Sequence, residues 1–414
     1  MKRNPAIALL LSLVVVTLLF GCGTNPAQSS TTDSSSSKQG SADPVVAKGL
    51  PAIHVEGSTD LPGNFYLSWV YSRDIAMLDG KGNVVWSKHE DQPAEGLTTG
   101  WWDFKKHVVD GKTYYSYHDQ TGAYDSYGLT GYAPGERVIL DENFNEVKRI
   151  RFEASDVVAK GDPLDGHDFL MFDLNHYFLS GYIHETVHNV PGHESDSKVV
   201  YSYLQEVRDG KVVWDWRSAD YPELYGLTVT DGTPDANDYA NEKTDAPDIM
   251  HFNAMRLNDS GNLVCSFRNL STVLCLDRTK DKDQILWKLS GGADEFGLAD
   301  YQKSSCQHYV TVDGNRITVY DNGNKNQLSR VVTWQVDASA KKADTVDVHS
   351  FNNKFSTACG SAQRVDGSLY VVSFGVAMKD NEYMAVIDFA TGKKLLSVKL
   401  DNPQDFTYRC VYFE

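Results

Sequence analysis

Residues 249–276 read IMHFNAMRLNDSGNLVCSFRNLSTVLCL, and this stretch indicates the fold more clearly than any other. An apolar strand opens at Phe252, and a polar turn at Ser260-Gly261 leads into a second apolar strand. A third strand follows at 273–276, and its partner lies at 285–287 beyond another polar turn. Short apolar runs separated by Gly, Asp and Asn turns are typical of antiparallel strands. The stretch therefore predicts one small sheet of four strands.

The same order recurs from about residue 50 to the end of the chain. The predicted turns between the first two strands of each unit are Pro62-Gly63, Asp110-Gly111, Asp173 to His176, Ser260-Gly261, Asp313-Gly314 and Asp366-Gly367. The predicted outer pairs are 75–78 with 84–86, 137–140 with 147–150, 200–207 with 212–214, 273–276 with 285–287, 331–336 with 345–348 and 384–387 with 394–398. Six such units predict an all-β fold, a six-bladed β-propeller with long inter-blade loops. The final strand, 408–413, is expected to pair with the first blade and close the ring.

The composition is that of a folded domain, and it limits the classes of partner that the protein can bind. Of 414 residues, 41% are hydrophobic and 23% are charged, which excludes wholesale disorder and a multi-pass membrane protein. With 39 Lys and Arg against 56 Asp and Glu, the net charge is −17, which argues against nucleic acid as a partner. An anionic substrate would therefore need a local positive pocket.

The first residues resemble a bacterial lipoprotein signal. Lys2 and Arg3 precede an apolar run over residues 5–20, and the segment LFGC ends at Cys22. We expect residues 1–22 to be a lipoprotein signal peptide and Cys22 to be acylated. An uncleaved N-terminal anchor is the alternative.

Residues 23–45 are rich in Ser and Thr, and they predict a flexible tether between the lipid and a propeller domain at 46–414. The expected location is therefore extracytoplasmic, with membrane anchoring through the lipid. Five further cysteines show no C-x-x-C spacing, which favours free thiols over a zinc site. A bridge between Cys265 and Cys275 is the alternative.

Three histidines fall at one place in the repeat. In a propeller the first strand of every blade lines the central channel, so equivalent residues of different blades form a ring. His167, His251 and His308 each open a predicted first strand, and hairpin register places Arg268 opposite His251. A single histidine of this kind is usually a satisfied core residue. Three of them beside an arginine favour a functional site at the channel mouth.

These residue types suit the handling of a tetrahedral oxyanion. Arginine donates to two oxygens, and one neutral imidazole can act as nucleophile while another moves a proton. The second hairpin also places Asp321 and Asn322 beside His308. A metal site is the other use of three imidazoles, but a neighbouring arginine would repel a cation. A metal-dependent hydrolase would need carboxylates there, and Asp168 and Asp321 are the obvious candidates.

Five groups of short segments stand in order along the chain: Asp165-Gly166-His167-Asp168-Phe169, His251-Phe252-Asn253 with Ser266-Phe267-Arg268, Gln307-His308 with Tyr320-Asp321-Asn322-Gly323, Ser329-Arg330-Val331-Val332, and Gly360-Ser361-Ala362-Gln363-Arg364. Together they resemble the bacterial aryl sulfate sulfotransferase family, and the resemblance extends over roughly residues 100–414. Two features depart from the family pattern: Tyr309 after the third histidine, and the absence of Gly in the turn after Asp173.

The resemblance implies a six-bladed propeller outside the cytoplasm that moves a sulfuryl group from a phenolic sulfate ester to a phenol through a sulfated histidine. It implies small-molecule partners, an aryl sulfate donor and a phenol acceptor, and no cofactor, metal or nucleotide sulfate donor. By position, His308 would be the nucleophile, and Arg268, His251 and Asn253 would hold the sulfuryl oxygens. His167 would transfer the proton, with His251 as the alternative.

Two other classes of function remain open from the residues alone. A non-enzymatic propeller lipoprotein, serving as a binding module or scaffold, would share the repeats but would not need His and Arg at the channel mouth. A metal-dependent propeller hydrolase is the second. The inter-blade loops also carry tyrosines that either stack on a phenol or pack the loops onto the blades: Tyr124, Tyr127, Tyr132, Tyr221, Tyr225, Tyr239 and Tyr301.

Overall fold

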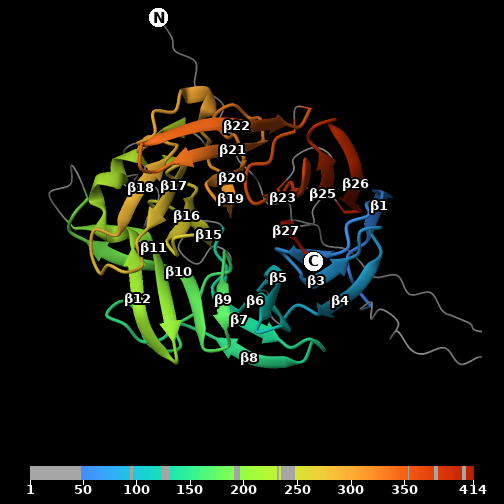
Figure 1. Cartoon of the computed structure of the whole chain (residues 1–414). Helices are drawn as coiled ribbons and strands as arrows, with labels where there is room; N and C mark the ends of the chain where they lie inside the picture. Colours follow the sequence, from blue (N-terminus) through green and yellow to red (C-terminus); the bar gives the residue numbers. More distant parts are fainter. Residues whose placement is uncertain are drawn as a thin grey trace, which may run out of the picture. The chain divides into compact units, whose positions relative to one another are not determined.

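The structure is a computed structural model, and it describes residues 48–93, 97–123, 131–190, 196–230, 233–234, 248–352, 354–376, 381–402 and 407–414. The predicted lipidation residue Cys22 and the predicted tether lie outside the described residues. The compact unit Pro44–Glu414 contains six small sheets, which are arranged as a six-bladed β-propeller (Figure 1).

Each blade is an antiparallel sheet, whose strands follow one another from the channel outward. Blade 1 is β27 (Thr407–Phe413), β2 (Asn64–Trp69), β3 (Arg73–Leu78) and β4 (Val84–Glu90). Blade 2 is β5 (Trp101–Val109), β6 (Lys112–Gln120), β7 (Gly135–Leu140) and β8 (Glu146–Ile150). Blade 3 is β9 (Leu170–Asp173), β10 (His176–Val187), β11 (Ser197–Arg208) and β12 (Lys211–Arg217).

The second half of the ring follows the same plan. Blade 4 is β15 (Phe252–Leu257), β16 (Leu263–Phe267), β17 (Thr272–Leu276) and β18 (Ile285–Leu289). Blade 5 is β19 (His308–Asp313), β20 (Arg316–Asp321), β21 (Arg330–Asp337) and β22 (Lys342–Ser350). Blade 6 is β23 (Ser361–Asp366), β24 (Leu369–Ser373), β25 (Glu382–Asp388), β26 (Lys393–Leu400) and β1 (Ile53–Gly57). The inter-blade loops contain β13 (Val229–Thr230), β14 (Thr233–Pro234) and short 3₁₀ helices at Ser218–Asp220, Pro222–Leu227 and Asp300–Gln302.

The C-terminal strand closes the ring. β27 pairs with β2 along the register Asn64↔Phe413 to Trp69↔Thr407, which confirms the predicted closure. The predicted hairpin turn at Pro62-Gly63 is wrong. The strand before it, β1, pairs instead with β26 on the outer edge of blade 6, because β27 already occupies the inner position of blade 1. The other five predicted turns join the inner hairpins, and all six predicted outer pairs form.

The blades are held together by apolar side chains packed between neighbouring sheets. Because Cys265 pairs with Leu274 and Cys275 with Val264, the two cysteines face opposite sides of their sheet and contribute to different apolar clusters. All five described cysteines are free thiols, as the sequence favoured. No helix among the described residues is long and apolar enough to cross a membrane.

Candidate functional site

The three histidines of the repeat meet at the end of the channel where the inner strands begin. His167 precedes β9, His251 precedes β15, and His308 opens β19. The ring centroid of His167 lies 4.9 Å from that of His251 and 6.2 Å from that of His308. His167 and His308 are buried, and the side chain of His251 is only 13% exposed. We call these three rings the histidine cluster; their convergence agrees with the sequence analysis.

The His308 ring is held in one tautomer. Its Nδ1 lies 2.7 Å from the backbone oxygen of Gly360, and because a carbonyl only accepts, Nδ1 carries the proton. In the neutral ring Nε2 therefore keeps its lone pair. This Nε2 atom is buried, and it has no hydrogen-bond partner among the described residues. An unpartnered buried nitrogen is costly unless a ligand or a reaction uses it.

His167 and His251 have a different partner at Nδ1. The carboxylate of Asp165 binds Nδ1 of His167 and also accepts the His167 backbone N–H at 3.0 Å. The carboxylate of Asp248 lies 2.5 Å from Nδ1 of His251 and accepts the His251 backbone N–H at 3.0 Å. Each aspartate orients its imidazole through these two contacts. In the cluster, a carboxylate therefore binds Nδ1 of two imidazoles, whereas only a neutral carbonyl binds Nδ1 of the third.

Burial sets the ionisation of the cluster. Burial, followed by the positive charge of Arg409 and the neighbouring imidazoles, lowers the pKa of His308 well below its usual value. Burial also lowers the pKa of His251, although Asp248 acts in the opposite direction. His308 is therefore neutral at pH 7, which is the state that a nucleophilic imidazole needs.

Asn253 contacts the backbone on both sides of His308. Its side-chain nitrogen donates to the Gln307 oxygen at 2.9 Å, and its side-chain oxygen accepts the Tyr309 N–H at 3.1 Å. Asn253 is fully buried. These contacts make Asn253 a positioning residue for His308, and the predicted direct contact with a transferred group stays a prediction.

Arg268 lies opposite His251 as predicted, since its backbone N–H donates to the His251 oxygen at 2.8 Å. Its guanidinium donates to the Asn269 side chain at 3.0 Å and to the Thr357 oxygen at 3.2 Å, and it is half-buried. The positive charge of Arg268 also acts on His251.

The two residues predicted beside His308 are engaged elsewhere. Asp321 binds Arg330 at 2.7 Å, and the side chain of Asn322 donates to the backbone oxygens of Ser356 and Cys359. The residue that pairs directly with His308 is Tyr320.

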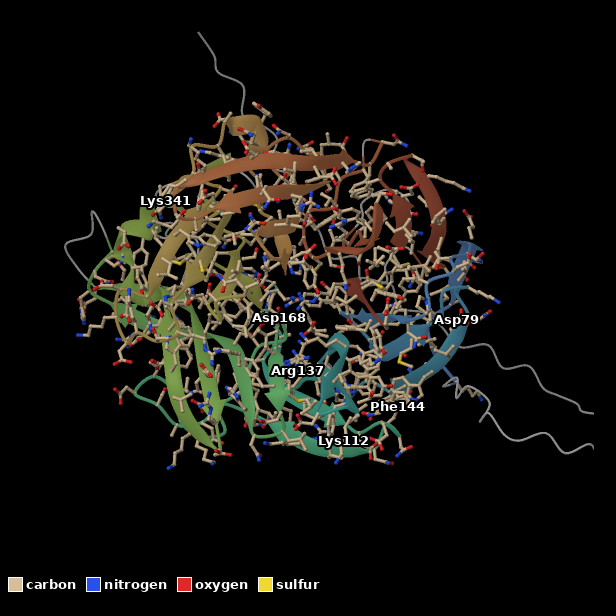
Figure 2. The ribbon with its side chains drawn as sticks, in the orientation of Figure 1. Asp79, Lys112, Arg137, Phe144, Asp168 and Lys341 are labelled. Carbon is tan, nitrogen blue, oxygen red and sulfur yellow. The ribbon has the colours of Figure 1, made fainter. Side chains whose placement is uncertain are left out.

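A group of charges, all buried except the partly buried Arg256, lies beside the histidine cluster, and sequence reasoning missed it. We call it the charged layer; its members are Asp103, Lys105, Arg137, Asp168, Arg256 and Arg409. Four cationic side chains thus face two carboxylates, which makes the centre of this acidic protein locally positive. Figure 2 shows Asp168 and Arg137 near the middle of the ring, whereas Asp79 and Lys341 lie toward its rim.

Asp168 connects three blades through this layer. Its carboxylate binds Lys105 at 2.6 Å and Arg256 at 2.8 Å, and it accepts the Met255 N–H at 2.9 Å. Burial opposes the ionisation of Asp168, but Lys105, Arg256 and Arg409 lower its pKa well below the usual range. Because Asp168 and Asp321 are both bound by cations, neither of these carboxylates is available for a metal ion. In the described parts of the chain, no group of three His, Cys, Asp or Glu residues is arranged to hold one.

Arg409 joins the charged layer to the histidine cluster. Its Nε donates to Asp103 at 2.9 Å, and its Nη2 donates to the backbone oxygen of His167. Its Nη1 is buried and finds no partner within the described residues. A guanidinium donor and the Nε2 lone pair of His308 are therefore both unsatisfied in one region. The only sequence signal for Arg409 was its place on the closing strand.

The backbone at the site is strained in several places. His251, Tyr309 and Cys359 adopt positive φ angles of 55°, 62° and 61° although none is a glycine. Such conformations cost of the order of 1–3 kcal/mol each and concentrate at functional sites. At Tyr309 the strain accompanies a bulge in the β19–β20 pairing, which turns His308 and Tyr309 out of the regular alternation.

One loop tyrosine reaches the cluster. The hydroxyl of Tyr132 donates to Asp248 at 3.0 Å, and its ring centroid is 6.0 Å from that of His251. Tyr221 and Tyr225 are buried in blade packing, and Tyr301 is exposed. Tyr124, Tyr127 and Tyr239 lie outside the described residues.

The family model for arylsulfotransferase (ASST) matches residues 123–383, which is more than half of the chain. The chain belongs to the arylsulfotransferase family. No curated protein matches it. Among solved structures, a protein of unknown function from Bacteroides caccae is 10% identical, with a TM-score of 0.46 and coverage of 86% of this chain and 100% of that chain. The periplasmic gluconolactonase of Pseudomonas aeruginosa is 13% identical, with a TM-score of 0.43 and coverage of 85% of this chain and 99% of that chain.

Membership of the arylsulfotransferase family confirms the resemblance seen in the sequence and supports a sulfotransferase role with small-molecule substrates. The matched range contains the histidine cluster, Asn253 and Arg268, and it ends before Arg409.

Proposed function

We propose that the protein is an aryl sulfate sulfotransferase, which transfers a sulfuryl group from a phenolic sulfate ester to a phenol through a sulfated His308. The observation that carries the proposal is the difference in Nδ1 partners within the histidine cluster. His308 has a neutral carbonyl partner and a free Nε2 lone pair, whereas His167 and His251 have carboxylate partners. The first arrangement suits a nucleophile, and the second suits a group that gains and loses a proton.

In the first half-reaction, Nε2 of His308 attacks the sulfur, so that an N–S bond forms while the bond between sulfur and the phenolic oxygen breaks. The leaving phenolate takes a proton from His167 or His251. In the second half-reaction, the acceptor phenol gives its proton to the same imidazole, its oxygen bonds to sulfur, and the N–S bond breaks. The cycle is ping-pong, and it returns every residue to its starting state.

The sulfuryl group carries negative charge on three oxygens throughout this transfer, and the transition state is loosely bonded, as in phosphoryl transfer. Positioned donors therefore supply most of the stabilisation. Arg268 and His251 are the donors that family position implies. The unsatisfied Nη1 of Arg409 adds a donor of the required charge in the same region. Asn253 contributes by holding the backbone of His308.

A covalent adduct tests the proposal directly. Incubation with 4-nitrophenyl sulfate and no acceptor should release 4-nitrophenol and add one sulfuryl mass to the peptide that contains His308. A phenol added afterwards should remove that mass and appear as its sulfate ester. An adduct on His167 or His251 would leave the ping-pong cycle but overturn the assignment of the nucleophile. Turnover without any protein adduct would overturn the covalent mechanism.

We also propose that the mature protein is held at the outer side of a membrane through a lipid on Cys22. The support is the LFGC segment and the Ser-rich stretch that follows it. Cys22→Ala should move the protein from the membrane fraction to the soluble fraction. Wild-type protein found soluble, with its leader intact, would contradict this part of the proposal.

A further inference from the structure

The inner hairpins turn at the end of the channel opposite the histidine cluster, and a separate cavity opens there. Its volume is about 400 Å³. Its wall includes the ends of three inner strands, at Asp313 of β19, Arg364 of β23 and Phe413 of β27. It also extends between blades 5 and 6, to Arg316 of β20 and Tyr370 of β24. Cavities of this size are common for small organic ligands.

The wall of this cavity is rich in positive charge. It includes five cationic side chains and one carboxylate, namely Lys105, Lys106, Arg256, Arg316, Arg364 and Asp313. His107 also lines it, but burial, followed by the charge of Lys105, lowers its pKa to about 3, so this ring adds no charge at pH 7. An anion is the ligand that such a wall favours.

The cationic side chains of the wall differ in how far protein groups already bind their donors. Lys105 and Arg256 bind Asp168 in the charged layer, and Lys106 binds the backbone oxygen of Glu414. Arg364 donates to the Gly367 oxygen at 2.7 Å and reaches Asp313 only at 3.4 Å. Within the described residues, Arg316 makes one hydrogen bond, to Gln335 at 3.4 Å. Arg316 therefore has most of its donor capacity available for a ligand.

Aromatic rings complete the wall. Phe169, Tyr309, Tyr370 and Phe413 all line the cavity. The ring of Tyr309 lies 4.5 Å from the guanidinium of Arg256 and 4.8 Å from that of Arg409. A flat apolar ring can pack against these side chains while its charged group faces Arg316.

We propose that this cavity is a second ligand site, which binds a small aromatic anion independently of the histidine cluster. The site takes a ligand with one planar ring system and one compact anionic group such as a sulfonate, sulfate or carboxylate. It does not depend on the proposed transfer reaction, since none of its lining residues is His167, His251 or His308.

Naphthalene-2-sulfonate is the probe that tests the proposal, because its carbon–sulfur bond prevents sulfuryl transfer. Calorimetric titration of the wild-type protein should show saturable binding that weakens as salt increases. The neutral analogue 2-naphthol should bind at least tenfold more weakly. Equal binding of the neutral analogue, or no binding of the sulfonate, would overturn the proposal.

Variants locate the bound probe. Arg316→Gln should weaken binding of naphthalene-2-sulfonate about tenfold or more. Arg364→Gln removes a second positive charge from the cavity wall and should also weaken binding. Lys112→Gln is the matched control, because Lys112 begins strand β6 of blade 2, carries the same charge and does not line the cavity. It should leave binding unchanged, and so should His308→Asn. Binding that His308→Asn abolishes and Arg316→Gln leaves intact would place the probe at the histidine cluster and overturn the second site.

Discussion

The histidine cluster and the charged layer are neighbours in one channel, but they differ in how their ionisable groups are paired. In the charged layer, ion pairs hold each carboxylate: Asp103 binds Lys105 of its own strand, and it also binds Arg137 and Arg409 of two other strands. In the histidine cluster, His308 presents an unpartnered nitrogen. The difference shows how a buried site can be both rigid and reactive. The paired charges link the strands, and after burial the charge of Arg409 lowers the pKa of His308, whose Nε2 stays available for the proposed reaction.

Removal of the reactive nitrogen should have the largest effect on activity. His308→Asn should lower kcat for transfer from 4-nitrophenyl sulfate by at least about 10⁴-fold, because the covalent route is lost. The unfolding midpoint should stay near that of the wild type, since the variant removes no ion pair. His167→Asn is the comparison, and it should slow turnover while some adduct still forms. Turnover of His308→Asn within tenfold of wild type would contradict the role of this ring.

In the charged layer, the expected effect is on stability. Asp168→Asn leaves Lys105, Arg256 and Arg409 buried with one carboxylate fewer, and it should lower the free energy of unfolding by about 3–5 kcal/mol. The control is Asp79→Asn, a turn carboxylate at the rim of the ring, which should cost less than about 1 kcal/mol. Denaturant titration of both variants checks this. Equal losses would mean that the layer adds no special stability.

Arg268 tests the part of the site that lies opposite His251. Arg268→Lys keeps the positive charge but loses the planar set of donors, so kcat/KM should fall by the equivalent of about 2–4 kcal/mol. Steady-state kinetics with a fixed acceptor measures the loss. A lysine variant with wild-type kinetics would show that Arg268 only supports the loop that contains Thr357.

Gly360 tests how the His308 tautomer is maintained. Its φ is +91°, and a Cβ there would lie 2.7 Å from the Ser373 oxygen, so the carbonyl that binds His308 must move in Gly360→Ala. We expect kcat to fall about tenfold through misplacement of Nε2, with a smaller change in KM. Gly210→Ala is the control, because a Cβ at this turn meets nothing within 4 Å. Equal kinetics of the two variants would argue against a positioning role.

The smallest expected effect on stability is its dependence on pH. Burial, followed by the charge of Arg137, lowers the pKa of His118 to about 4. The unfolded chain, with a histidine pKa of about 6.5, then binds the proton more readily, so this stabilisation is complete above that pH and decreases below it. At pH 5 the loss for this residue is at most about 2 kcal/mol. Unfolding titrations at pH 7 and pH 5 should show a smaller difference in His118→Asn than in wild type; an equal difference would contradict the assignment.

The repeat explains why the blades and the histidine cluster could be predicted. His167, His251 and His308 occupy one repeat position, and the apolar alternation of each hairpin sets the register of Arg268. The charged layer has no such periodic signal. Asp103 enters it because a bulge between Trp102 and Lys105 interrupts the alternation of β5, and sequence pattern does not specify bulges. The neighbours of Asn253 could not be predicted for the same reason, since a bulge before Ala254 turns it toward the next blade.

The first blade differs from its prediction for a topological reason. The local sequence pattern identifies β1 and β2 as strands. The hairpin between them was predicted only because the two strands follow each other in the chain. In the closed ring, β27 occupies the inner position of blade 1, and β1 pairs with β26 on the outer edge of blade 6. The sequence predicts that 408–413 closes the ring on the first blade, but it does not predict that this strand takes the place assigned to β1.

The position of Arg409 on β27 also bears on when the protein can work. As the chain emerges from a ribosome or a membrane translocation pore, the histidines of blades 3, 4 and 5 are already available while β27 is still to come. Until that strand docks, Asp103 lacks one of its cations, and the backbone oxygen of His167 lacks its guanidinium donor. Blade 1 also lacks its inner strand until then. The surroundings of the histidines thus depend on the closing strand, so a product that lacks β27 would carry the three histidines without the charge of Arg409.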